Sequence, residues 1–513
     1  MEPNCSVCTS NYLRGSIKKR LIVCCDGTFF GVDKGDDQYS SNVARLSRSI
    51  SKVGITAEGE KVPQVVYYQS GVGTGSLTVI NKTRQGAVGE SLAEKVCEAY
   101  NYLANNWSPG DEIFIFGFSR GAYTARSLAG FICEVGLLTP LMLDHFFDIY
   151  QAYRNRGTKK LAETDWAKTP LEAGELGTVP PRSGDPKQDL GTRMDFLRSS
   201  AHNHIKIKVV GVWDTVGSLG ALNWHGQAGD DRTFHSTRLS PKIENAFHAL
   251  AVDETRGNFP PTLWYLDSSC IDEHDNPKVN LKQCWFPGYH SDVGGRNKGD
   301  IDTNSVDEIA FAWMCDQLFG LLQLSGTALQ KYILFRIGDL KLDTKNKNNR
   351  DLKAAWSTIR WSDGTLNDTN GWTDWWWISS ILSTRSASYK RIPGETPASE
   401  VVNGKKKDIE YKRFNEEVHP SVRHRMLNAG DQPYIPTGLK KENGWNYVEA
   451  SGKRQAHWVK KSKGKDIFLN EYTIPKLGKP FQPGSGYDFW QGSLERTFAP
   501  KDILAAQDAY TEK

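Results

Sequence analysis

The sequence has few of the features that mark a membrane protein or a secreted, disulfide-bonded one. No apolar run approaches the roughly 18 residues that a membrane-spanning helix needs, and no apolar signal segment stands near the N-terminus. The nine cysteines are an odd number and are sparse for 513 residues, which argues against a disulfide framework. We therefore expect a cytoplasmic protein in a reducing compartment.

The sequence also lacks a strong excess of charge and a metal-binding pattern. A formal net charge of +4 is too small to indicate a nucleic-acid-binding protein, so we expect no nucleic-acid partner. Cys5 and Cys8 form a CxxC motif, but no second pair of cysteines or histidines follows at the spacing of a zinc site. We expect neither a metal nor another cofactor.

What the sequence does contain is a repeated pattern of apolar runs that end at polar residues. These are 21–25 before Asp26, 113–116 before Ser119, 205–213 before Asp214, and 284–289 before His290. The runs predict buried strands, and the helical patterns between them predict crossovers. We expect an α/β fold of the α/β-hydrolase type, with a mostly parallel sheet and helices on both faces. The polar residues should then gather at the carboxyl edge of the sheet, where such folds bind ligands.

Ser119 lies in the segment Gly117-Phe118-Ser119-Arg120-Gly121, between a predicted strand and a predicted helix. This strand–turn–helix context is that of a nucleophile elbow, in which a serine hydroxyl projects above the sheet edge. The glycines leave room for the strained turn. Two backbone donors are expected for an oxyanion, one from Arg120 and one from Gly27 and Thr28, which follow the first strand.

A reactive serine needs an imidazole base and a carboxylate that orients it. His290 is the favoured base, because it follows a predicted strand and precedes a glycine-ended loop. Asp214 is the favoured acid, since it ends a predicted strand, with Asp253 and Asp292 as alternatives. His248 is a weaker candidate base. Its apolar surroundings have a helical pattern, which favours a buried structural histidine.

The segment Asp26-Gly27-Thr28 has a second interpretation as the site of a phosphotransfer aspartate or a metal ligand. An Asp-x-Asp phosphohydrolase motif ending at Asp26 would place its first aspartate at position 24, which is Cys24. The metal-dependent phosphohydrolase class therefore loses most of its support.

The composition divides the chain into regions. We predict a catalytic domain at 19–335, with a cap or lid insertion at 156–200, where glycine, proline and mixed charge prevail. A tryptophan-rich accessory region is predicted at 336–513, because nine of the sixteen tryptophans lie between Trp356 and Trp490. Such a cluster packs over a core, lines a pocket or contacts a membrane surface peripherally.

Six motifs stand in an order that resembles one known family. They are Cys25-Asp26-Gly27-Thr28, Ser41-Asn42-Val43-Ala44-Arg45-Leu46, Gly117-Phe118-Ser119-Arg120-Gly121-Ala122, Trp213-Asp214-Thr215-Val216, His248-Ala249-Leu250-Ala251-Val252-Asp253-Glu254, and Phe286-Pro287-Gly288-Tyr289-His290-Ser291-Asp292-Val293-Gly294-Gly295. The chain resembles the α/β-hydrolase family that includes the phospholipase effectors of bacterial type VI secretion. The segment 418–423 is similar to one in eukaryotic, notably fungal, members. This resemblance implies that Ser119 is the nucleophile and that Asp214 and His290 are its partners.

These observations together predict a serine hydrolase. We expect it to cleave a carboxylic ester of a lipid-like or bulky apolar substrate through an acyl-enzyme on Ser119. Two alternatives stay open at this point. One is an acyltransferase, or an esterase acting on a biosynthetic product, with the same three residues. The other is a non-catalytic scaffold on a hydrolase fold.

Overall fold

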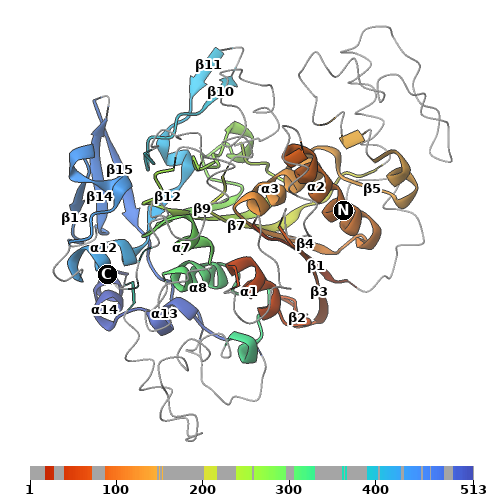
Figure 1. The fold of residues 1–513 in the computed structure, drawn as a ribbon, viewed down its shortest axis with the longest axis horizontal. Coiled ribbons are helices and arrows are strands. Elements are labelled where there is room, and N and C mark those ends of the chain that lie inside the picture. Colours follow the sequence, from red (N-terminus) through yellow and green to blue (C-terminus); the bar gives the residue numbers. More distant parts are fainter. Residues whose placement is uncertain are drawn as a thin grey trace, which may run out of the picture.

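An eleven-stranded sheet organises the chain in the computed structural model (Figure 1), with the strand order β13-β14-β15-β12-β9-β8-β7-β4-β1-β3-β2. The structure describes residues 18–27, 40–71, 87–146, 149–150, 153, 201–216, 238–256, 259–295, 306–329, 361–362, 364, 366, 390–402, 405–428, 433–451, 454–462, 464–478 and 489–511.

The strands of this sheet are β1 (Arg20–Cys25), β2 (Val53–Ile55), β3 (Lys61–Gln69), β4 (Glu112–Phe118), β7 (Ile207–Trp213), β8 (Ile243–Ala251), β9 (Asn280–Phe286), β12 (Glu416–Val418), β13 (Asn446–Val448), β14 (His457–Ser462) and β15 (Lys465–Glu471). Two short antiparallel pairs lie outside it: β5 (Leu137–Leu138) with β6 (Ala201–His202), and β10 (Ser399–Val402) with β11 (Lys405–Asp408). The α-helices are α1 (Asn42–Ser49), α2 (Ala87–Asn106), α3 (Arg120–Val135), α7 (His290–Gly294), α8 (Asp307–Gln317), α12 (Pro420–Asn428), α13 (Leu494–Phe498) and α14 (Lys501–Thr511).

The sheet is mixed but mostly parallel. From β3 through β1, β4, β7, β8, β9 and β12 to β15, every neighbouring pair is parallel. Antiparallel pairing is confined to the two ends, at β2 and at the β13-β14-β15 meander. The predicted α/β character with a mostly parallel sheet is therefore confirmed.

Helices bury both faces of the central strands, and the side chains of β1 show how. Leu21 and Val23 pack in a core with α2 and α3, whereas Ile22 and Cys24 pack in a second core with α1 and α8. Figure 1 shows these helix pairs on opposite sides of the sheet. Both sets of side chains are fully buried, which explains why such strands read as continuous apolar runs in the sequence.

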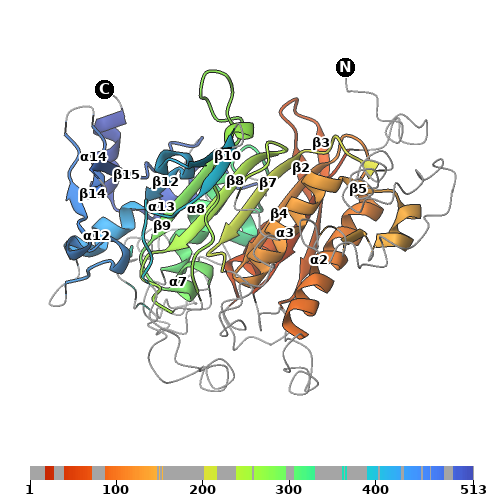
Figure 2. The same cartoon turned by 90° about the horizontal axis from the view of Figure 1, so that it is seen from above.

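The C-terminal part of the chain extends the same sheet beyond β9 (Figure 2). Strand β12 pairs with β9, and β15 pairs with β12. A third core covers this end, and Trp285 of β9 packs in it with Trp445 and Trp458. The sheet thus crosses the predicted boundary near residue 335. The predicted division into a catalytic domain, 19–335, and an accessory region, 336–513, stays a prediction.

One local expectation was wrong, and two lie outside the described residues. His248 belongs to strand β8 and not to a helix, because β8 is a central strand whose two parallel neighbours, β7 and β9, override the local helical pattern. The predicted lid at 156–200 and the tryptophan segment 372–377 both lie outside the described part of the chain.

Candidate active site

Ser119 stands at the turn between β4 and α3, as the elbow pattern predicts. Its backbone adopts φ 57° and ψ −122°, a strained region for a residue with a side chain. The Ser119 N–H donates to the carbonyl of Trp213 at 3.1 Å, and its own carbonyl accepts from Tyr123 at 3.2 Å. These bonds tie the turn to β7 and to the first turn of α3.

The two glycines of the elbow are required by close backbone approaches. A Cβ atom on Gly117 would lie 2.4 Å from the carbonyl oxygen of Gly121, and one on Gly121 would lie 2.2 Å from that of Cys25. Neither distance is compatible with a side chain. The strand β1 and helix α3 can therefore meet beneath Ser119 only because these positions carry no side chain.

His290 is the residue whose imidazole contacts Ser119. It begins α7, shortly after β9, and its Nε2 lies 2.8 Å from Ser119 Oγ. The rings of Phe118 and Phe259 flank the imidazole, with centroids 4.8 and 4.9 Å away. The imidazole is thereby held between two aromatic side chains and is almost fully buried.

Asp214 contacts the other side of the same imidazole. It follows β7 directly, with φ 39°, and its Oδ2 lies 2.6 Å from His290 Nδ1. Its Oδ1 accepts a hydrogen bond from the Ala251 N–H at 3.0 Å. Because β4, β7, β8 and β9 are parallel neighbours, their carboxyl ends bring Ser119, Asp214 and His290 together at one edge.

Arg391 completes the site from the C-terminal part of the chain, and sequence reasoning missed it. Its guanidinium donates to both Asp214 carboxylate oxygens, to Oδ2 at 2.9 Å and also to Oδ1. It also donates to the carbonyl oxygens of Ala251 and Phe259. Arg391 and Asp214 are both fully buried. No motif surrounds Arg391, so its role could not be found without the tertiary structure.

The charges around the imidazole determine the protonation states. Burial by itself raises the pKa of Asp214, but the charge of Arg391 and the hydrogen bonds from His290 and Arg391 hold that pKa well below its usual range. Burial lowers the pKa of His290, and the hydrogen bond to Asp214 only partly opposes this effect. At neutral pH the arrangement is a carboxylate, a neutral imidazole and a serine hydroxyl. A general base needs this state.

Glu254 adds a second carboxylate that sequence reasoning had not assigned a role, although it ends one of the quoted motifs. Its Oε2 accepts from the His290 N–H at 3.2 Å, and its carboxylate pairs with Arg256 at 2.8 Å. Burial alone would raise the pKa of Glu254, but Arg256 lowers it to about 2. The backbone of His290 is thus anchored by an ionised side chain.

The other candidate acids are engaged in structural roles. Asp253 accepts hydrogen bonds from Gly288, Tyr434 and Thr437, at 2.7, 2.6 and 2.7 Å, and so ties the β9–α7 turn to the C-terminal part. Asp292 accepts from the Tyr289 N–H at 2.8 Å and caps α7. The carboxylate at His290 Nδ1 is that of Asp214.

His248 occupies a fully buried position on β8, and its ring contacts Thr215 and Gln283. Its Nε2 accepts from the Thr215 N–H at 3.2 Å, and its Nδ1 lies 3.3 Å from Gln283 Oε1. Burial, reinforced by the charge of Arg126, lowers the pKa of His248 to about 3, so this imidazole is neutral.

Of the three residues expected to supply oxyanion donors, Arg120 and Gly27 lie in the described part of the chain. Arg120 begins α3 directly after Ser119, which is the position expected of one donor. The Gly27 N–H instead donates to Asp26 Oδ1 at 2.7 Å, and Thr28 lies outside the described residues. The Asp26 carboxylate also accepts from Ser41 and Tyr68, at 2.7 and 2.5 Å, so it ties the end of β1 to the start of α1 and to β3.

Within the described residues, no cluster of His, Cys, Asp and Glu side chains could hold a metal ion. No helix in the described part of the chain is long and apolar enough to cross a membrane.

The fold and the site define a class. A mostly parallel α/β sheet with serine, histidine and aspartate hydrogen-bonded in a row at its carboxyl edge is the arrangement of α/β hydrolases. A family model described as the type VI secretion Tle1-like phospholipase effector catalytic domain matches residues 19–317. The chain belongs to this family, which confirms the resemblance inferred from the motifs.

Similar proteins are found in a fungus and in bacteria. An uncharacterised protein of Saccharomyces cerevisiae is 28% identical over 254 residues, which are 47% of this chain and 32% of the relative. The chain thus matches about a third of that curated relative. This fungal relative supports the predicted similarity to eukaryotic members of the family.

Two solved structures show weaker similarity. The crystal structure of an uncharacterised protein from Pseudomonas aeruginosa is 18% identical, covers 60% of this chain and 47% of its own, and has a TM-score of 0.30. The Tle1 effector bound to the VgrG spike of the type VI secretion system is 19% identical, covers 55% and 52%, and has a TM-score of 0.28. Similarity at this level does not define a shared fold. The fold of this chain is defined by its own strand order.

Proposed function

We propose that this chain is a serine hydrolase that cleaves a carboxylic ester of a lipid-like substrate through an acyl-enzyme on Ser119. The observation that carries the proposal is the hydrogen-bonded row from Ser119 Oγ through His290 to Asp214, at 2.8 and 2.6 Å. The strained backbone of Ser119 supports it, because strain of this kind is typical of a nucleophile elbow.

Each group then has a defined task. His290 Nε2 accepts the Ser119 proton as Oγ bonds to the ester carbonyl carbon, and Asp214 stabilises the imidazolium that forms. The Arg120 N–H faces the resulting oxyanion. His290 then gives the proton to the departing alcohol, which leaves an acyl-enzyme. Water, deprotonated by the same imidazole, releases the acid and restores Ser119.

Two further assignments rest on this mechanism. We assign catalysis to residues 19–335 and a supporting role to residues 336–513, because Arg391 reaches Asp214 from the second region. The lipid-like class of substrate is supported by membership in a family of phospholipase effectors. An insertion at 156–200 would then serve as the lid over the acyl chain.

Labelling with a fluorophosphonate probe tests the proposal. The parent protein should label, whereas Ser119→Ala should not label and should lose about 10³-fold or more in ester turnover while remaining folded. Phospholipids and p-nitrophenyl esters of increasing chain length then define the substrate, and long chains should be turned over faster. Absence of labelling in a folded parent would favour a scaffold. Acyl transfer to added alcohols or amines in preference to water would favour an acyltransferase.

A further inference from the structure

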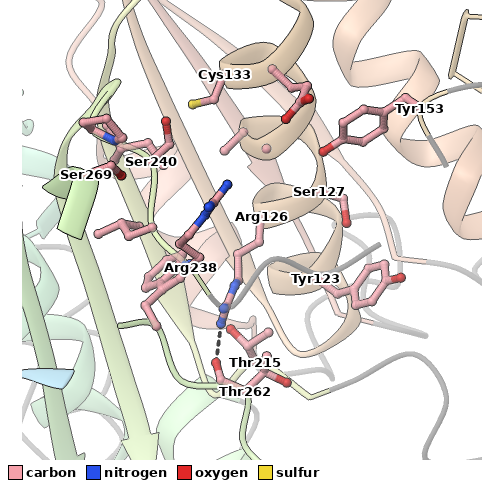
Figure 3. Close-up of a pocket in the computed structure, with 17 residues that line it drawn as sticks. Tyr123, Arg126, Ser127, Cys133, Tyr153, Thr215, Arg238, Ser240, Thr262 and Ser269 are labelled. Carbon is pink, nitrogen blue, oxygen red and sulfur yellow. Dashed lines mark hydrogen bonds between the residues drawn. The ribbon is translucent and has the colours of Figure 1, made fainter. Parts of the chain in front are cut away.

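A cavity of about 150 Å³ lies beside helix α3, close to the proposed active site (Figure 3). Its walls include Tyr123, whose N–H donates to the Ser119 carbonyl, and Thr215, which follows Asp214. The volume is about ten times the space that one buried water molecule requires. It is therefore large enough for a small polar group of a ligand.

Arg126 projects from α3 into this cavity and is incompletely satisfied. Its guanidinium stacks over the ring of Trp264, 4.2 Å from the centroid, and one nitrogen, Nη1, donates to the carbonyl of Thr262. The other nitrogen, Nη2, is buried and has no hydrogen-bond partner among the described residues. Burial lowers the pKa of Arg126, which reflects the cost of holding this charge away from water.

The arginines whose whole residues are buried in the described chain all pair with carboxylates. Arg20 binds Glu112, Arg45 binds Asp307 and Arg391 binds Asp214. Arg126 forms no ion pair with any described residue, although Glu134 also lines the cavity. An unpaired buried charge is expensive, and the usual compensation is an anion.

A second buried donor lies next to this guanidinium. Thr215 is only 2% exposed, and its Oγ1 has no hydrogen-bond partner among the described residues. Figure 3 shows Thr215 and Thr262 at the guanidinium end of Arg126. A cation and a hydroxyl thus converge at the end of the cavity nearest Asp214.

The remaining charged group on the wall is Arg238. Its side chain is 62% exposed and pairs with Asp267 at 3.3 Å, so its charge is largely balanced already. Arg126 is therefore the charge for which the structure supplies no counter-ion within the described residues.

We propose that this cavity is a phosphate-binding subsite formed by Arg126 and Thr215, and that it takes a phosphate carried by a lipid headgroup or free in solution. The headgroup case rests on the proposed function. A guanidinium with an unpartnered terminal nitrogen and a neighbouring hydroxyl suits a tetrahedral oxyanion, which offers acceptor oxygens in several directions.

Calorimetric titration with inorganic phosphate and with glycerophosphocholine tests the subsite without reference to catalysis. The parent should bind at least one of these probes, and Arg126→Gln should weaken that binding by about tenfold or more, as expected for a lost charged hydrogen bond. Arg454→Gln is the matched control. Arg454 also lies over an aromatic ring, that of Phe468, but far along the sheet at β15, and its variant should bind as the parent does.

Turnover of a phospholipid and of a neutral diacylglycerol with the same acyl chains identifies the source of the phosphate. An increase in KM for the phospholipid alone in Arg126→Gln assigns the subsite to the headgroup. Equal turnover of both lipids by parent and variant, together with lost phosphate binding, assigns it to free phosphate. Should Arg126→Gln not fold, Thr215→Val provides the same comparison by removing only the hydroxyl.

Two results would overturn the proposal of a phosphate subsite. One is that the parent binds neither probe; the other is that a folded Arg126→Gln and Thr215→Val bind as tightly as the parent. Failure of the proposed hydrolase function has a different signature, because Ser119 would then not label and neither lipid would be hydrolysed, whatever the titration shows.

Discussion

Arg391 binds the carboxylate of Asp214 with both terminal nitrogens, although the two residues are 177 positions apart in the sequence. Both side chains are fully buried. The residue that orients His290 is thus itself oriented from the C-terminal part of the chain. In the proposed mechanism Arg391 is a positioning residue, since it contacts Asp214 and not the reacting atoms.

The variant Arg391→Gln should lose both stability and activity. Removal of one partner leaves a buried carboxylate without its counter-charge, which costs about 3–5 kcal/mol in unfolding free energy. Fluorophosphonate labelling of Ser119 should slow about tenfold or more, with partial recovery in Arg391→Lys. Arg423→Gln is the control, because it removes a paired arginine that contacts Glu471 outside the site. It should leave labelling unchanged.

The same pair predicts a pH dependence of stability. The pKa of Asp214 is held below its usual range in the folded state, so the stabilisation is present above the unfolded pKa near 4 and is lost as pH falls through the folded value. Chemical denaturation of parent and Arg391→Gln should therefore give a stability difference that narrows below about pH 4. A difference that stays constant down to pH 2 would contradict this account.

Two of the buried histidines, His290 and His248, should respond differently to the same substitution. His290→Ala should lower ester turnover by about 10³-fold, since it removes the base, and leave most of the stability. His248→Ala should retain most of the turnover but lose about 1–3 kcal/mol, because the buried Thr215 N–H loses its acceptor. Turnover and thermal unfolding, measured on both variants, distinguish these roles.

The rate of Ser119 labelling should depend on the ionisation of His290. Burial lowers the pKa of His290 below its ordinary value near 6.5, so the imidazole is a free base at neutral pH and gains a proton only in acid. The second-order rate of labelling should reach half of its maximum below pH 6.5. A midpoint above pH 7 would mean that Asp214 outweighs burial.

The buried carboxyl of Glu416 should lower the free energy of unfolding at alkaline pH. Burial raises the pKa of this residue to about 7. Hydrogen bonds from Trp285 and Gly394 oppose this shift only in part, and no cation among the described residues pairs with the carboxyl. Its folded pKa exceeds the unfolded value near 4.5, so the stabilisation is present below that value and is lost as pH rises through 7. Glu416→Gln should match the parent near pH 4.5 and exceed it by about 3 kcal/mol above pH 8. The exposed variant Glu442→Gln should show no such difference.

Much of the catalytic half could be predicted from the sequence, for a physical reason. Strands buried on both faces need unbroken apolar runs, so the segments at 21–25, 113–116 and 205–213 could be recognised locally. The elbow could be recognised because Gly117 and Gly121 are imposed by backbone contacts.

The tertiary structure decided what depends on distant parts of the chain. Asp214, Asp253 and Asp292 are similar in sequence context, and only the packing shows which carboxylate contacts His290. His248 has a helical pattern, yet pairing with two parallel neighbours makes its segment a strand.

By itself, then, the sequence determined the family, the parallel strands and the serine at its turn, because each depends on residues within a few positions of one another. Only the fold decided that Arg391 is the partner of Asp214. Arg391 has no local signature, since an ion pair constrains two side chains in space and leaves no periodicity along the chain. The extension of the sheet by β12 and β15 is likewise a matter of long-range pairing.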